Sequence, residues 1–143
     1  MVGSALIAAY CNSGGEADRK AALEQMRARG GKYPGGACGY WGACGAAVSA
    51  GMFWSIVTGA TPLSGKSWGE ANLLTSRCLE GISQLGGPRC CKRNSFTAAK
   101  IAAQFAGEHA GIGMELPEQI VCDYSAENRQ CRKKSCPYYR ENA

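Results

Sequence analysis

Cysteines are the residues of this chain whose type and spacing most clearly suggest chemistry. The sequence holds nine of them in 143 residues, with a single histidine. Cys122, Cys131 and Cys136 lie close together, separated by eight and four residues, and Pro137 follows the last of them. Few apolar residues surround them, and metal ligation can supply the order that apolar burial does not, because ligation and folding are coupled. We therefore expect these three thiolates to bind a metal, with a fourth ligand from elsewhere in the chain.

Two adjacent cysteines, Cys90 and Cys91, are the candidates for that fourth ligand. They immediately precede an expected helix, and a helix N-terminus favours the thiolate form. Three cations flank the pair: Arg89, Lys92 and Arg93. We expect these cations to offset the negative charge of a metal cluster or of an anionic substrate. The alternative is a loop in which one of the two thiols is buried and the other solvated.

A second thiol pair, Cys38 and Cys44, lies in a glycine-rich turn with five residues between the two cysteines. No charged residue occurs between Lys32 and Lys66, and a segment of helical length follows the turn directly. Free N–H groups at the start of such a helix point back at the turn and favour a thiolate there. We predict that Cys38 and Cys44 carry the catalytic chemistry, as a redox dithiol, a sulfur carrier or further metal ligands.

The identity of the metal is less closely determined than its ligands. A Cys-Pro ending occurs in ferredoxin motifs, although the spacings differ from the bacterial pattern, and paired CxxC zinc ribbons do not match either. We predict an iron–sulfur cluster, a [4Fe–4S] centre, in a protein of electron or sulfur transfer. A structural zinc module and a metal-free thiol oxidoreductase are the alternatives. An iron left open by a three-cysteine site would make the protein a lyase or desulfurase, so enzymatic activity stays an open question.

The remaining cysteines suggest structure and compartment. Cys78 lies among leucines at helical spacing, which favours a buried structural thiol, whereas the role of Cys11 is ambiguous. The N-terminal residues lack the basic region and cleavage site of a secretory signal. We therefore expect a reducing, cytoplasmic location, where clustered cysteines indicate metal or catalysis rather than disulfides.

Hydrophobic periodicity predicts an all-α fold of about five helices in a single domain, 1–143. The expected helices are 1–12, 16–29 opened by a capping box at Ser13 and Glu16, 43–58, 68–84, and one running from a cap at Asn94 or Ser95 to His109. The helix 43–58 is charge-free, and Ala43, Ala47 and Gly51 give it a small-residue stripe, so we expect it at the centre. The segment 118–143 is expected to be irregular and ordered by metal, with 119–122 as a short strand at most.

Two function classes are disfavoured. The net charge of +5 is modest, and no interleaved aromatic or groove-reading motif accompanies the basic residues, so we expect no nucleic-acid partner. The apolar segment 43–58 is diluted by Gly, Ser and Thr, which favours a core helix over a membrane span.

Four segments carry a family resemblance: GGACGYWGACGAAVSAGMFWSIVTGATPL, TSRCLE, GGPRCCKRNSF and the C-terminal Cys-Pro segment. Together they resemble an uncharacterised cysteine-rich domain family, catalogued as a domain of unknown function, that occurs alone or attached to SAM-dependent methyltransferase-like proteins. The resemblance implies a redox or sulfur-transfer protein as partner, and a methyltransferase-like protein as context rather than activity. More loosely, Cys44-Gly45-Ala46 is similar to the GCAxxG-type redox family, which implies helices packed around redox-active cysteines. No CxxCH haem motif accompanies it.

Overall fold

The computed structural model describes residues 2–143 and shows an all-α fold, as predicted. Within these residues no strand forms, and the expected strand at 119–122 is reduced to one isolated bridge between Cys122 and Tyr139. The elements are α1 (Val2–Asn12), α2 (Arg19–Gly30), α3 (Ala37–Tyr40), α4 (Gly45–Val57), α5 (Lys66–Leu85), α6 (Cys91–Ala110), and the 3₁₀ turns η1 (Lys133–Ser135) and η2 (Arg140–Asn142).

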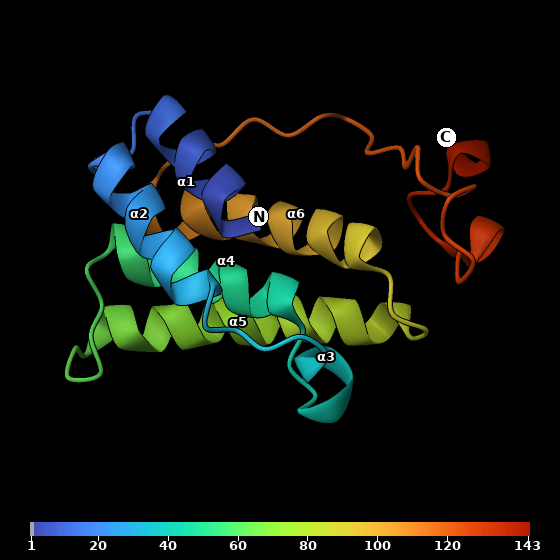
Figure 1. The fold of residues 1–143 in the computed structure, drawn as a ribbon. Helices are drawn as coiled ribbons and strands as arrows, with labels where there is room; N and C mark the ends of the chain where they lie inside the picture. Colours follow the sequence, from blue (N-terminus) through green and yellow to red (C-terminus); the bar gives the residue numbers. More distant parts are fainter. Residues whose placement is uncertain (1) are drawn as a thin grey trace.

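Helix α4 is the central element, packed against α1, α2, α5 and α6 (Figure 1). Its small residues Ala47, Ala50 and Gly51 are buried, which lets neighbouring backbones approach. A Cβ atom on Gly51 would lie 1.9 Å from the Thr75 hydroxyl on α5. The predicted central small-residue helix is therefore confirmed, with bounds slightly inside the predicted 43–58.

An aromatic cluster fills the centre of the helical body. The rings of Phe53, Trp54 and Phe105 pack edge to face, with centroids 6.0 and 5.0 Å apart. His109 stacks on Phe105 at 3.9 Å, and its Nδ1 lies 3.3 Å from Glu70. The Trp54 indole also donates to Glu70, at 3.1 Å. The single histidine thus belongs to this core network.

Three local details differ from the predictions. Helix α2 begins at Arg19 because the Asp18 carboxylate caps it, accepting from the Ala21 N–H at 3.0 Å, and the predicted cap at Ser13 does not form. Helix α6 begins four or five residues earlier than predicted, because its N-cap is Cys90 instead of Asn94 or Ser95. The glycine-rich turn that holds Cys38 contains the single-turn helix α3, so residues 2–143 form six α-helices where about five were predicted.

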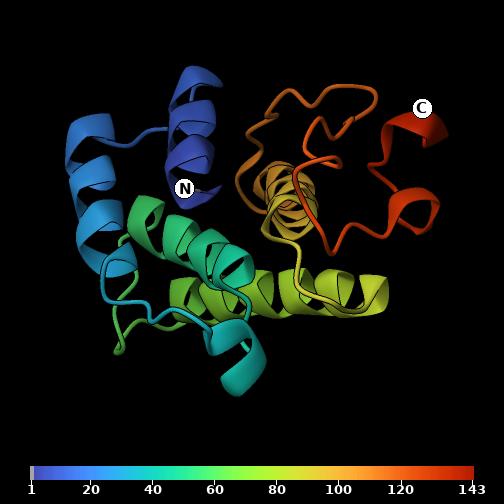
Figure 2. The same ribbon diagram turned by 45° about the vertical axis from the view of Figure 1, so that its right-hand side comes forward.

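The C-terminal segment folds back onto the N-terminal end of α6 (Figures 1 and 2). Tyr138 anchors it, because its hydroxyl lies 2.8 Å from that of Thr97 and its ring packs edge to face on Phe96. The Cys122 N–H donates to the Tyr138 carbonyl at 2.8 Å. Beyond α6 the buried residues are Met114, Cys136 and Tyr138. The segment is therefore irregular and thinly packed, as predicted.

None of the helices in residues 2–143 combines the length and apolar character that crossing a bilayer requires.

Candidate metal and thiol site

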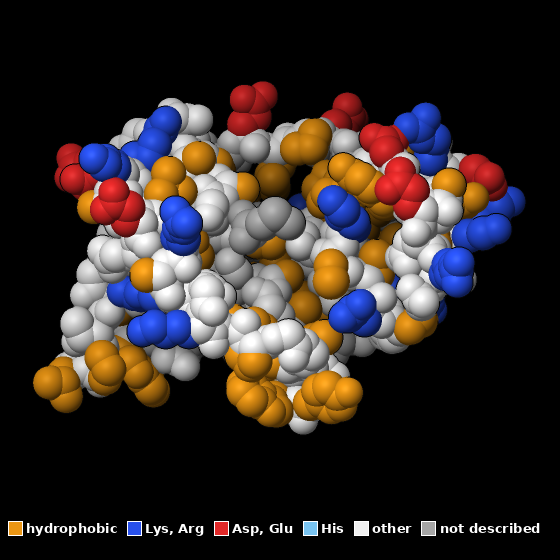
Figure 3. Space-filling model, in the orientation of Figure 1, with side chains coloured by type: hydrophobic (Ala, Val, Ile, Leu, Met, Phe, Trp, Pro, Cys, Tyr) orange, Lys and Arg blue, Asp and Glu red, His pale blue; other side chains and the backbone are white. Residues whose placement is uncertain are grey.

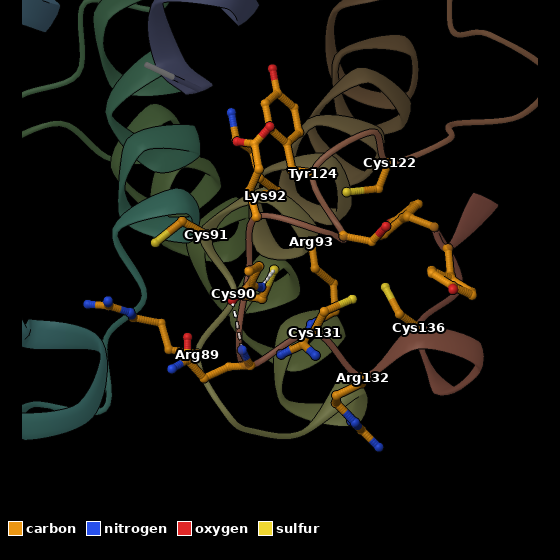
Figure 4. Close-up of a pocket in the computed structure, with 16 residues that line it drawn as sticks. Arg89, Cys90, Cys91, Lys92, Arg93, Cys122, Tyr124, Cys131, Arg132 and Cys136 are labelled. Atoms are coloured by element: carbon orange, nitrogen blue, oxygen red, sulfur yellow. Dashed lines mark hydrogen bonds between the residues drawn. The ribbon is translucent and has the colours of Figure 1, made fainter. Parts of the chain in front are cut away.

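One cavity of about 260 Å³ gathers all five cysteines that the sequence suggested as metal ligands (Figure 4). It lies between the first turn of α6 and the C-terminal segment. The five are Cys90, Cys91, Cys122, Cys131 and Cys136. The fold brings them together because Tyr138 docks the segment on Thr97 of α6, about two helical turns from Cys90.

The five sulfurs are not equivalent. Figure 4 shows the sulfur of Cys91 directed away from the other four, and this side chain is exposed. Cys90 is half-buried, and Cys136 is buried. Of the two alternatives for a fourth ligand, the arrangement favours Cys90.

Across residues 2–143, no three Cys, His, Asp or Glu side chains already stand in the arrangement that would hold a single metal ion. Binding at this cavity would therefore draw the sulfurs inward. Three of the four come from the C-terminal segment, the least packed part of the chain, so the inward movement falls where packing resists it least.

Two cavity sulfurs accept hydrogen bonds. The Asn128 side-chain amide donates to Cys90 Sγ at 3.5 Å, and the Lys133 backbone N–H donates to Cys131 Sγ at 3.4 Å. Lys133 has φ 47°, which turns its N–H toward the preceding cysteine. An amide N–H can only donate, so each of these sulfurs is the acceptor, the role that suits a thiolate or a metal-bound sulfur.

Two cysteines of the helical body have the opposite role. Cys78 lies 3.8 Å from the Ala98 carbonyl oxygen and Cys11 lies 3.7 Å from that of Ala17. A carbonyl oxygen can only accept, so each of these cysteines must carry its proton to make the bond. Burial, followed by the charge of Cys44, raises the pKa of Cys78 to about 12. Cys78 is completely buried, which confirms its predicted orientation toward the core.

The cavity is strongly cationic. Glu127 is the one acid among its described lining residues, whereas four are basic: Arg89, Lys92, Arg93 and Arg132. Lys92 sits over the Tyr124 ring, 3.8 Å from its centroid. The three cations predicted to balance an anionic group therefore do line the cavity, and Arg132 adds a fourth.

Arg93 is the most unusual of these cations, because only 4% of it is exposed. It donates to the carbonyl oxygens of Gly86 and Pro88, at 2.7 and 2.9 Å. No carboxylate within residues 2–143 forms an ion pair with it. A buried charge without a counter-ion is costly, so an anion in the cavity would stabilise the site.

The turn between α5 and α6 is fixed from both sides. Gly86 has φ +68°, a conformation that favours glycine. Arg93 holds the turn from α6, and the Arg132 guanidinium holds it from the C-terminal segment by donating to the Leu85 carbonyl. The turn in this way positions Cys90 at the edge of the cavity.

Cys38 and Cys44 line a second cavity, of about 540 Å³, which shares Arg89 and Arg93 with the first. Cys38 lies on α3, and Cys44 is the N-cap of α4. The Asn94 side-chain amide donates to Cys44 Sγ at 3.4 Å, so this sulfur is also an acceptor. The structure thus separates the nine cysteines into two neighbouring cavities and the helical body.

The sequence did not indicate the amide donors. Asn94 was expected as a helix cap, and Asn128 carried no signal at all. Asn94 follows the cysteine–arginine stretch directly, and that proximity was the one available hint. Both donors owe their role to tertiary packing, which brings each amide to a cysteine 38 or more residues away.

Comparison with known proteins places the chain by family alone. A family model described as a family of unknown function, DUF5714, matches residues 1–139. No curated protein and no solved structure matches the chain. The likeness to the GCAxxG family and the association with methyltransferase-like proteins stay predictions.

Proposed function

The chain belongs to DUF5714, a family of unknown function, and we propose that it is an iron–sulfur protein of electron or sulfur transfer. A [4Fe–4S] cluster would be bound by four thiolates: Cys90, Cys122, Cys131 and Cys136. The cytoplasm is the proposed location, since reducing conditions keep thiols available.

One observation carries this proposal. Four sulfurs from distant parts of the sequence line a single cationic cavity, and two of them already accept N–H hydrogen bonds. Hydrogen bonds to the sulfurs are among the interactions that tune iron–sulfur clusters. A set of unligated thiols would gain nothing from such donors and from four surrounding cations.

The size of the cavity favours a cluster over a single ion. Zinc holds each sulfur at about 2.3 Å, so four ligands close around one point. Here the cysteines line a cavity of about 260 Å³ together with eleven other residues, which leaves more room than one ion needs. A polynuclear centre uses that space with a smaller inward movement of each sulfur.

The charges support the same assignment. A cluster ligated by four thiolates is an anion, and Arg93 is a buried cation without a carboxylate partner in the described chain. Arg89 and Lys92 add positive charge at the α6 end of the cavity. Together they would lower the energetic cost of placing a negative cluster next to protein.

A redox or sulfur-transfer protein is the proposed partner, with a methyltransferase-like protein as one context. If one iron were left without a cysteine, it could bind substrate, and the protein would be a lyase or desulfurase. The arrangement of four sulfurs around the cavity favours the fully ligated, electron-transferring form.

Anaerobic purification followed by a visible spectrum and analysis for iron, labile sulfide and zinc tests the proposal. Brown protein with stoichiometric iron and sulfide is expected. Serine substitution at Cys90, Cys122, Cys131 or Cys136 should abolish the iron, whereas Cys91→Ser, the matched control, should retain it. Colourless protein with one zinc would establish the structural zinc module instead, and the absence of stoichiometric metal would point to a thiol oxidoreductase.

A further inference from the structure

Cys38 and Cys44 both line the second cavity, near the two ends of a loop that one backbone hydrogen bond closes. The Ala43 N–H donates to the Ala37 carbonyl at 3.4 Å. Cys38 directly follows Ala37, and Cys44 directly follows Ala43. The Tyr33 hydroxyl donates to the Ala43 carbonyl. Burial raises the pKa of Tyr33, and the charges of Cys44 and Cys38 raise it further.

Asn94 connects this thiol pair to the metal-binding cavity. Its Nδ2 donates to Cys44 Sγ at 3.4 Å, while its Oδ1 accepts from Arg93 Nε at 3.5 Å. Its backbone N–H donates to the Cys90 carbonyl at 3.0 Å. The path from Cys44 to the proposed cluster ligand Cys90 therefore has two parts: one side-chain hydrogen bond to Asn94, and one helical turn, a rise of about 5.4 Å, from Asn94 to Cys90.

Arg93 and Asn94 are both buried, at 4% and 6% exposure. Arg93 lines both cavities, so the same cation faces the cluster site and the thiol pair. Packing alone does not explain these two residues. Apolar side chains could fill the same space without the cost of removing a charged or polar group from water. Asn94 donates to the Cys44 sulfur on one side, while Arg93 donates to the carbonyls of the turn before Cys90 on the other.

We propose that Cys38 and Cys44 form a dithiol–disulfide couple that receives electrons from the cluster and reduces an organic disulfide. This inference rests on the proposed cluster, which supplies the electrons one at a time. The substrate class is a disulfide, small or carried by a protein.

Cys38 is the residue that a substrate meets first. It lies on α3, where Tyr40 and Trp41 are 89% and 69% exposed. Figure 3 shows apolar groups on the lower edge of the molecule, in the region where Figure 1 places α3. Cys44 lies further in, against Asn94, and is the thiol closer to the cluster ligand Cys90.

The reaction balances in three steps. The Cys38 thiolate attacks one sulfur of the substrate, forming a mixed disulfide and releasing the first substrate thiolate. The Cys44 thiolate then attacks Cys38 Sγ, which releases the second thiolate and leaves a Cys38–Cys44 disulfide. Two electrons from the cluster, in two single-electron transfers, and two protons restore the dithiol. A one-electron reductant reloads the cluster after each transfer.

Reduced methyl viologen as electron donor, with oxidised glutathione or insulin as disulfide, tests the proposal on the metal-loaded protein. Viologen oxidation by wild type should depend on the added disulfide, and the two disulfides distinguish a small substrate from a protein one. Cys38→Ser and Cys44→Ser should each lower the rate at least about tenfold while iron and sulfide stay unchanged. Cys11→Ser is the matched control and should keep the wild-type rate. Cys44→Ser should also accumulate a mixed disulfide at Cys38, visible by peptide mass spectrometry.

The inference is overturned if either cysteine variant keeps the wild-type rate, or if oxidation of the loaded protein yields no Cys38–Cys44 disulfide. Iron content is read separately. If the purified protein holds no iron, both the proposed function and the proposed delivery of electrons to the thiol pair are wrong. Protein with full iron but an inert Cys38–Cys44 pair would end this inference alone.

Discussion

The helical body and the cavity proposed to bind the cluster use cysteine in opposite ways. In the body, Cys11 and Cys78 donate to backbone carbonyls and must keep their protons. At the cavity, Cys90 and Cys131 accept from N–H groups. The direction of the hydrogen bond thus distinguishes these two pairs of cysteines, which residue type alone does not.

The two regions also differ in what orders them. The body has an apolar core that includes Phe53, Trp54 and Phe105, each almost fully buried. Beyond α6, by contrast, Met114, Cys136 and Tyr138 are the buried side chains of the described chain. The body can therefore fold by apolar burial, whereas the segment depends on its anchor at Tyr138 and, in our proposal, on the cluster.

The largest expected effect comes from Cys136→Ser, which removes a buried cluster ligand. Metal ligation is worth about 10–16 kcal/mol in zinc-finger peptides, so its loss should release the C-terminal segment. Limited trypsin digestion should then cleave after Arg129 or Arg132 much faster than in wild type, while helical circular dichroism of the body is retained. Loss of the helical signal together with the metal would show that the two regions do not fold separately.

An opposite perturbation should destabilise the body and leave the cavity unaffected. Gly51→Leu forces a side chain into Thr75 of α5, where a Cβ alone would lie 1.9 Å from the hydroxyl, and should cost about 3 kcal/mol. Gly69→Ala is the matched control, because a Cβ there meets no atom within 4 Å. It should stabilise the protein by up to about 1 kcal/mol through helix propensity. Urea unfolding measures both, and equal stability of Gly51→Leu and wild type would contradict the packing of α4 on α5.

The buried thiol predicts a pH dependence in the alkaline range. The pKa of Cys78 is raised to about 12 in the fold, from an unfolded value of 9.0. Between these two pH values the Cys78 thiol keeps its proton in the folded state but loses it in the unfolded state. The contribution of this thiol to the free energy of unfolding is therefore complete below pH 9 and falls as the pH rises. The slope is at most about 1.4 kcal/mol per pH unit. Urea unfolding of wild type and Cys78→Ala should converge above pH 9, and parallel curves would contradict the protonated thiol.

A smaller effect is expected on the acid side, at Glu70. Burial acts to raise the pKa of this carboxyl, but hydrogen bonds from Trp54 and His109 and the charge of Lys66 outweigh it and lower the pKa. A lowered pKa stabilises the fold above the unfolded value of 4.5, and that contribution is lost as pH falls below it. Glu70→Gln should therefore be less stable than wild type at pH 7, by about 1 kcal/mol. The gap should shrink toward pH 3, and a gap independent of pH would contradict the ionised network.

Much of the fold was predictable because its signals are local. The charge-free segment 43–58 favoured a central helix, and the predicted helix 68–84 ends within one residue of the end of α5. Boundaries failed where a side chain found a different partner. Asp18 took the cap expected of Ser13, and Asn94 turned to Cys44 instead of capping α6.

The candidate site was predictable as a set of residues but not as a geometry. Clustered cysteines and adjacent cations indicated which side chains would share a cavity, and they do line one. The choice of Cys90 over Cys91 depends on which side of α6 each faces, and that depends on α6 beginning at Cys91. The role of Arg93 in both cavities depends on its bond to the Gly86 carbonyl; the Gly-Gly-Pro sequence indicates a turn there but not this partner.

X-ray absorption at the iron edge of the anaerobically purified protein tests the central claim most directly. The account predicts iron in stoichiometric amount, with a first shell of sulfur alone and a second shell of neighbouring iron. A zinc ion bound by four sulfurs, or iron surrounded by oxygen and nitrogen, would contradict it.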